Sequence, residues 1–178
     1  MQTARDLFVH ELQDMFDAEQ RLVEALGEQE EESSRPELQK AFASHREQTE
    51  NQVERLRQAF EEIGEEPEET ECKGIKGLIE EHESFKEEDP SEELLDIFNV
   101  GAAIKVESYE ICAYESLVKL GKELGFKKAV NLLNQNLKEE QQTLKKMETF
   151  SNKLKPSELG VEEDEEERGS RRRSGRAA

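Results

Sequence analysis

Three glutamates occupy helix positions where apolar residues are expected. An α-helix turns by about 100° per residue, so its buried face can be read from the spacing of apolar side chains. Glu19 falls at the centre of the apolar stripe of the first helical stretch, and Glu107 continues the stripe of the third. Glu140 interrupts the stripe of the fourth stretch, whereas the adjacent Glu139 points outward. Glu110 lies about one turn after Glu107, at the edge of its stripe.

The second helical stretch presents polar residues to the same interior. His45 faces inward and Gln48 lies at the edge of the face, in the same phase as Glu107 and Glu110 on their own stretch. Glu50 lies on a flank, from which a bend in the helix would turn it inward. The spacing leaves open whether Glu50 replaces His45 or Gln48 among the inward residues.

Buried carboxylates are costly unless they are neutralised, paired or bound to a metal ion. Lysine and arginine are scarce on the inward faces, since Arg46 and Lys105 lie beside these residues and not among them. Several glutamates with a histidine at the middle of a helical bundle are typical of carboxylate-bridged dimetal sites, and hard oxygen ligands suit iron and manganese. We therefore predict a dinuclear iron or manganese site. Its predicted ligands are Glu19, His45, Gln48, Glu107, Glu110 and Glu140. The alternative is that these carboxylates reach solvent through a splayed bundle or pair with arginine at its ends.

Four long helices must position these side chains. The apolar period predicts them over residues 3–31, 36–63, from about 92 to Gly121 or Gly125, and 126–150. On the last of them the residues expected to face inward are Val130, Leu133, Leu137, Leu144 and Met147. The connection over residues 65–90 is long and acidic, and contains a short amphipathic segment expected to pack over the bundle. Connections that are short, long and short predict two antiparallel hairpins joined by a crossover, which is the ferritin-like four-helix bundle.

A chain of 178 residues fits one domain with a tail. We assign residues 1–155 to the bundle and 156–178 to a charged, disordered tail, because few apolar residues follow Pro156. Two cysteines without a CxxC motif favour neither a zinc ribbon nor a disulfide scaffold.

The composition also bears on partners and location. A net charge of −19 argues against nucleic acid as the main partner, because phosphates would be repelled. No run of 18 apolar residues and no secretory signal occur, so we expect no membrane partner and a cytoplasmic protein. A homodimer is expected, because bundles usually cover apolar flanks such as the region of Phe85.

Five segments resemble the YciE/YciF family of ferritin-like proteins. They are DLFVHELQDMFDAEQRLVEAL, LQKAFASHREQTENQVERL, ECKGIKGLIEE, KVESYEICAYESL and LNQNLKEEQQT, of which the first and fourth are the most specific. The resemblance implies a dimetal-type bundle associated with bacterial stress responses. Carried over by position, it gives the site residues Glu19, His45, Glu107, Glu110 and Glu140.

The sequence also departs from that family. The family commonly has histidine at Ser108 and an acid at Gln48 and Leu144, so an asymmetric or single-metal site is conceivable. Two functions follow from these observations. One is a stress-related di-iron or iron–manganese oxidoreductase that acts on peroxide, oxygen or ferrous iron. The other is a non-enzymatic, stress-associated interaction or structural bundle with a vestigial or structural metal site.

Overall fold

The computed structural model describes residues 1–154, which fold into five helices. They are α1 (Ala4–Glu32), α2 (Pro36–Ile63), α3 (Lys73–Lys86), α4 (Glu92–Glu123) and α5 (Lys127–Lys153). The described chain contains no strand. The domain boundary expected at residue 155 and the charged tail over 156–178 lie outside the described residues.

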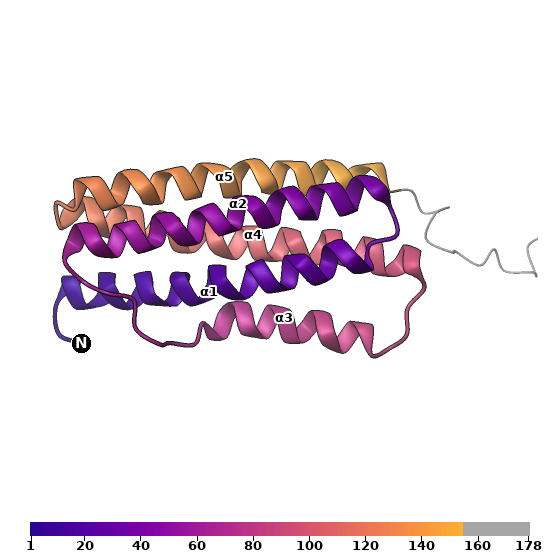
Figure 1. Ribbon diagram of the computed structural model, residues 1–178, viewed down its shortest axis with the longest axis horizontal. Helices are drawn as coiled ribbons and strands as arrows, with labels where there is room; N and C mark the ends of the chain where they lie inside the picture. The colour runs from indigo at the N-terminus through magenta and orange to yellow at the C-terminus, as the bar shows by residue number, and fades with distance from the viewer. Residues whose placement is uncertain (155–178) are drawn as a thin grey trace, which may run out of the picture.

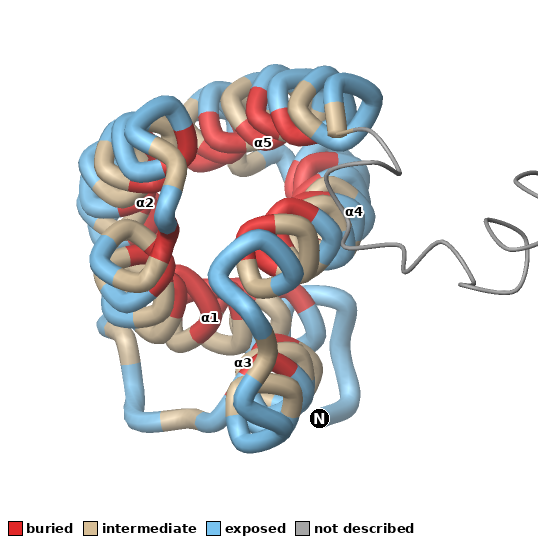
Figure 2. The backbone as a smooth tube through the Cα atoms, turned by 90° about the vertical axis from the view of Figure 1, so that its right-hand side faces the viewer, coloured by how far each residue is buried: buried red, intermediate tan, exposed pale blue. Residues whose placement is uncertain are grey.

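The four long helices form a bundle in which α1 pairs with α2 and α4 pairs with α5 (Figure 1). Both pairs are antiparallel hairpins with short turns, whereas α2 and α4 run in the same direction (Figure 1). The segment between them therefore crosses the length of the bundle, and α3 lies within it, outside the four-helix ring (Figure 2). This arrangement confirms the ferritin-like fold expected from the connection lengths. Along residues 1–154, none of the helices has both the length and the hydropathy of a membrane span.

Local signals set the helix ends. Thr3 caps α1, because its hydroxyl accepts from the Asp6 amide while the Asp6 carboxylate accepts from the Thr3 amide. Pro36 opens α2, and Gly64 ends it in the left-handed conformation with φ 72°. The Ser91 side chain caps α4, so this helix begins directly after the Asp89-Pro90-Ser91 segment.

The bundle core consists of two apolar clusters separated by a polar layer. One cluster lies around Phe8, Leu12, Phe60 and Leu133, and the other contains Leu26, Leu38, Phe42, Val100, Ala103 and Met147. Between them, α2, α4 and α5 bury polar residues. These are His45, Thr49, Gln52, Glu107, Glu110, Asn136, Glu140 and Thr143. The candidate site residues therefore lie in the middle of the bundle, with apolar packing at both ends.

The face that α5 buries is the expected one at Val130, Leu133 and Met147, and differs at two leucines. Leu137 and Leu144 are only partly buried, whereas Asn136 and Thr143 are fully or almost fully buried. Asn136 and Thr143 share a face with Glu140, since residues three and four apart are neighbours on a helix.

The crossover helix α3 is attached to the bundle at both ends. At its start, the Cys72 amide donates to Asp17 Oδ2 on α1 at 2.7 Å. Near its end, His82 Nε2 lies 2.7 Å from Asn99 Oδ1 on α4 and 2.9 Å from Glu32 Oε1 on α1. These contacts hold α3 against both α1 and α4, and Figure 2 shows α3 outside the ring of four helices.

The region of Phe85 is covered from within the chain. The Phe85 ring stacks on Phe98 of α4, with centroids 3.9 Å apart and planes 5° from parallel. Both rings remain partly exposed, so the apolar flank that suggested a homodimer is partly covered within one chain.

Candidate metal centre

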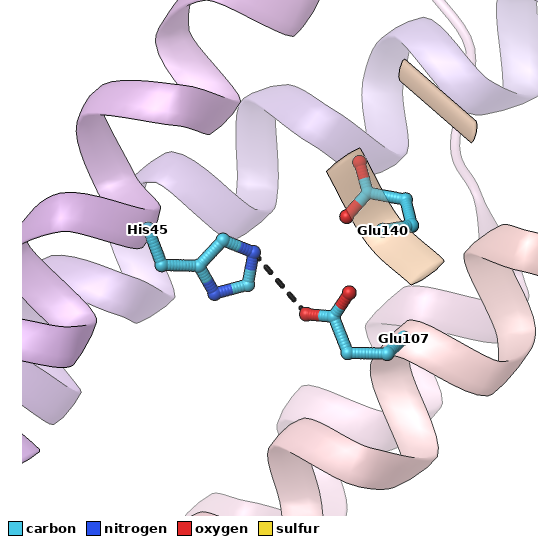
Figure 3. A group of neighbouring side chains, drawn as sticks. All are labelled: His45, Glu107 and Glu140. Atoms are coloured by element: carbon cyan, nitrogen blue, oxygen red, sulfur yellow. Dashed lines mark ion pairs between the residues drawn. The ribbon is translucent and has the colours of Figure 1, made fainter. Parts of the chain in front are cut away.

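Three side chains from three helices meet in the polar layer. His45 of α2, Glu107 of α4 and Glu140 of α5 each offer one ligand atom, and these atoms all lie within 4.8 Å of one another (Figure 3). All three residues are buried. A histidine nitrogen and two carboxylate oxygens at this separation can bind a single metal ion from one side.

Glu19 and Glu110 complete the buried acidic set. Glu19 is 0% and Glu110 is 1% exposed, although the sequence placed Glu110 at the edge of its stripe. Burial raises the pKa of Glu110 far above its usual value, and the charges of Glu19, Glu140 and Glu107 raise it further. Both residues thus interact electrostatically with the cluster of Figure 3, but they lie outside its group of mutually close ligand atoms.

Burial shifts the carboxyl groups of the cluster toward their protonated, neutral form. Burial is the main cause that raises the pKa of Glu140 to about 7, and burial together with the charge of Glu140 raises the pKa of Glu107 well above its usual range. Within residues 1–154, neither lysine nor arginine forms an ion pair with Glu19, Glu107, Glu110 or Glu140. Among the described residues, no cationic lysine or arginine is therefore in direct contact to stabilise the ionised form of these carboxyl groups.

His45 is present as the neutral imidazole. Burial, and secondarily the charge of Lys146, lowers its pKa to about 4. Its Nε2 atom is 3.2 Å from Glu107 Oε1, the contact drawn in Figure 3, and because the ring is uncharged at neutral pH this contact is not a salt bridge. A neutral imidazole with a free nitrogen lone pair is the form that binds metal ions.

In Glu19 and in Glu140, one carboxylate oxygen accepts a hydrogen bond and the other does not. Tyr114 donates its hydroxyl proton to Glu19 Oε1, and Gln52 donates to Glu140 Oε1. Asn136 contacts both of these residues. Its side-chain amide donates to the Tyr114 hydroxyl at 2.8 Å and to the backbone carbonyl of Gln52 at 3.4 Å. Such outer hydrogen bonds are the usual means of orienting the ligands of a metal ion.

The other potential metal-ligand atoms of the cluster lack hydrogen-bond partners. Glu19 Oε2, Glu140 Oε2, Glu110 Oε1, both Glu107 oxygens and His45 Nδ1 are buried without a hydrogen bond. Unsatisfied buried acceptors are rare in folded proteins, and each costs about 1–3 kcal/mol. The donor set therefore fits a hard divalent cation, which would satisfy these oxygens together.

The sequence departures do not all bear on this site. Gln48 is partly buried, and its amide nitrogen donates to the Thr143 hydroxyl at 3.2 Å. Glu50 is exposed whereas His45 is buried, so the structure answers the question that the spacing left open: His45, and not Glu50, faces inward. Ser108 is also exposed and donates back to the Ile104 carbonyl, so this departure leaves the buried cluster unchanged.

The two tyrosines occupy different environments. Tyr114 is buried against Glu19, as just described, and is a hydrogen-bond donor within the cluster. Tyr109 faces α3 instead, where its hydroxyl lies 3.3 Å from Cys72 Sγ and donates to Asp14 Oδ2 at 3.3 Å. Asn136 was not identified from the sequence, although its spacing of four from Glu140 places it on the same helix face.

The fold and the buried carboxylates define a ferritin-like four-helix bundle with a candidate metal-binding cluster. The chain belongs to the family described as a domain of unknown function, DUF892, whose sequence model matches residues 3–159. It is 38% identical to protein YciF of Escherichia coli K12 over 144 residues, which cover 80% of this chain and 87% of YciF.

Solved structures agree with this assignment. The crystal structure of the E. coli stress protein YciF matches with a TM-score of 0.82 and 36% identity, over 86% of this chain and 100% of that one. YcfI from Rhodopseudomonas palustris, provisionally described as a structural protein, matches with a TM-score of 0.81 and 35% identity, over 87% of this chain and 96% of that one.

Proposed function

We propose that this protein is a stress-related dimetal-carboxylate protein whose buried cluster binds iron or manganese and acts on peroxide, oxygen or ferrous iron. The observation that carries the proposal is that Glu19 and Glu140 each have one carboxylate oxygen that accepts a hydrogen bond and one buried oxygen that has no partner. A purely structural buried carboxylate would satisfy both oxygens with donors.

The charge of the cluster supports two ions. Glu19, Glu107, Glu110 and Glu140 are all buried and together carry four negative charges when ionised. Two divalent cations neutralise this charge completely. His45, Glu107 and Glu140 would hold one ion, while Glu19 and Glu110 supply carboxylates for the other. Gln48 is proposed as a weak neutral ligand on the α2 side, which makes the site asymmetric.

A bound pair of iron or manganese ions supplies redox chemistry, because both metals change oxidation state under carboxylate and imidazole ligation. The protein itself fixes the ligands. Tyr114 and Gln52 orient Glu19 and Glu140, and apolar clusters lie on both sides of the polar layer. The name of the E. coli relative supports a role under stress.

Metal stoichiometry tests this proposal. Protein purified without chelator and titrated anaerobically with ferrous or manganous ion should bind about two ions per chain. Glu107→Gln should lose at least one of them, whereas the control Glu50→Gln, at an exposed position, should retain both. Loaded protein should consume peroxide faster than the metal-free protein. Wild-type protein that binds neither ion would refute the proposal.

The second candidate function is a non-enzymatic structural or interaction bundle. It is favoured by the provisional description of the R. palustris relative and by the amide and leucine at Gln48 and Leu144. On this reading the site is vestigial or holds a structural ion. Metal that binds tightly but supports no turnover of peroxide, oxygen or ferrous iron would favour it.

We also propose a cytoplasmic homodimer with no nucleic-acid partner. Phe85 no longer supports the dimer, since it stacks on Phe98. Among residues 1–154 the exposed large apolar residues are Met1, Leu7 and Leu94. Leu7 and Leu94 lie near the starts of α1 and α4, which are at opposite ends of the bundle in Figure 1. Light scattering on purified protein decides the oligomeric state.

A further inference from the structure

A cavity of 210 Å³ extends from the surface of the molecule to the candidate metal ligands. It lies between α1, α3 and α4, and both His45 and Glu107 line it. His45 Nδ1 and both Glu107 oxygens are buried without hydrogen-bond partners. The inner part of the cavity therefore offers polar atoms that are not used by the fold.

The wall of the cavity is apolar and its rim is acidic. Aliphatic residues from all three helices line it, including Leu22 of α1, Leu78 and Ile79 of α3, and Val106 of α4. The exposed Glu24, Glu28 and Glu83 also line it, together with Arg21 and the buried Gln29 and His82. His82 is paired with Glu32, its Nε2 atom lying 2.9 Å from Glu32 Oε1. Arg21 is already engaged, since its Nε atom lies 2.6 Å from Asp17 Oδ2.

Small residues create the space, and α3 closes it from outside. Ala25 and Ala102 face the cavity from α1 and α4, where larger side chains would fill it. The middle of α3 forms the roof of the cavity. The end of α3 is held to α1 by Lys86, whose ammonium lies 3.6 Å from Glu28 and 3.1 Å from Glu32. With α3 attached at Cys72 and His82 as well, the cavity has a fixed shape.

We propose that this cavity is the substrate pocket of the metal centre and takes an uncharged aromatic molecule of one or two fused rings with one polar group. This inference rests on the proposed function and makes it more specific, because it names a small organic substrate for the same site. A dry cavity of about 150 Å³ holds one benzene ring, so 210 Å³ has room for a somewhat larger aromatic molecule such as indole. The apolar wall receives the ring, and the acidic rim repels anions.

The polar group of the substrate would reach His45 and Glu107. A hydroxyl or N–H donor at this end would satisfy a Glu107 oxygen that otherwise has no partner. A second cavity, of 250 Å³, also reaches His45, but from the α2–α5 side and past Lys40 and Lys146. Its lysines suit anions, so the two openings differ in the charge that they admit.

Indole is a suitable probe, because the chain contains no tryptophan and indole fluorescence can be read without background. Indole should bind the purified full chain with a blue shift of its emission. Ala102→Leu and Ala25→Leu, which fill the cavity from opposite walls, should each weaken binding at least tenfold. Gly101→Leu is the matched control on α4, since a side chain there meets nothing within 4 Å, and it should change binding less than twofold.

Charge and metal provide two further readouts. Binding to the cavity is the part of the binding that Ala102→Leu removes. At this place indole-3-carboxylate should bind at least tenfold more weakly than indole. In protein loaded with manganous ion, the proton resonances of indole should broaden, and Ala102→Leu should suppress this broadening. Zinc, which is diamagnetic, should not cause it.

The outcomes separate the two proposals. Indole that binds and is displaced by both cavity-filling variants, in protein that takes up no manganese, supports the pocket and overturns the metal function. Indole that fails to bind either form of the wild-type protein overturns the pocket, whatever the metal content. Binding that is unchanged by both variants, or equal affinity for the anion at the same place, also overturns it.

Discussion

Replacing Glu140 by glutamine should stabilise the metal-free protein and remove its response to metal. The pKa of Glu140 is raised to about 7, mainly by burial, from a usual value of 4.5. A carboxyl whose pKa is raised on folding penalises the folded state above the unfolded pKa, and the penalty is complete above the folded pKa. Since one pKa unit corresponds to about 1.4 kcal/mol, ionised Glu140 costs the fold about 3 kcal/mol at pH 8.

Glutamine keeps the shape of the residue and its main hydrogen bond. The amide oxygen can still accept from Gln52, which holds Glu140 Oε1 in the wild-type protein. Glu140→Gln should therefore raise the melting temperature of metal-free protein at pH 8 by about 6–12 °C, given about 2–4 °C per kcal/mol for a chain of this size. At pH 5 the gain should be small, because the wild-type carboxyl is then largely protonated.

Thermal melts with chelator and with anaerobic manganous ion form the assay. Metal at 100 times its Kd adds about 2.7 kcal/mol to a protein that binds it, so the wild type should rise on loading while Glu140→Gln should not. The stability advantage that the variant holds in chelator should thus shrink or reverse in manganese. Glu139→Gln is the control: Glu139 is partly exposed and its carboxylate lies 2.6 Å from Arg55, so this change should cost about 0–1 kcal/mol and leave the metal response intact. A Glu140→Gln protein that is less stable than wild type in chelator at pH 8 would refute the reasoning, because it would make Glu140 a structural charge.

Three further outcomes are expected. Tyr114→Phe removes the donor to Glu19 and should destabilise the chain by about 1–3 kcal/mol in urea unfolding and weaken metal binding about 10–100-fold by titration. Gly74→Ala should cost about 1–3 kcal/mol, because a Cβ there would lie 2.5 Å from the Tyr109 ring, whereas Gly77→Ala, with nothing within 4 Å, should stabilise by about 0.5–1 kcal/mol; calorimetry compares the two. Burial lowers the pKa of His82, but hydrogen bonds to Glu32 and Asn99 outweigh it and raise the pKa above 6.5, so this stabilisation is complete below pH 6.5 and is lost as pH rises through the folded value. The melting temperature of His82→Gln should therefore fall less than that of the wild type between pH 6 and pH 8.5.

The fold was predictable because each helix carries its own period and caps. Phase arithmetic found Glu19, Glu107 and Glu140, since all three lie at the centre of an apolar face and are buried. On α5 it was wrong only at the leucines at 137 and 144, which are partly buried, whereas the neighbouring Asn136 and Thr143 are buried. Leucine can pack against a neighbouring side chain at the margin of a helix, whereas an amide that serves a buried network must face inward.

Helix α4 explains a second shortfall. It packs against α1 and α5 on one side and α3 on the other, so apolar residues surround much of its circumference. A helix of this kind has no single stripe, and the edge position assigned to Glu110 followed from treating it as if it had one. Hydrogen bonds such as Tyr114–Glu19 join residues 95 positions apart, and no local pattern predicts which partner meets which.

The division of the cluster between the two hairpins has a consequence for folding kinetics. The α1–α2 hairpin carries Glu19 and His45, and the α4–α5 hairpin carries Glu107, Glu110 and Glu140. Contacts within a hairpin are local and form early, whereas the two hairpins meet only after the crossover closes. A metal ion that needs ligands from both would bind after the rate-limiting step, so it would leave the folding rate unchanged and slow unfolding. The ions at the centre of the bundle would then prolong the lifetime of the folded state without speeding its assembly.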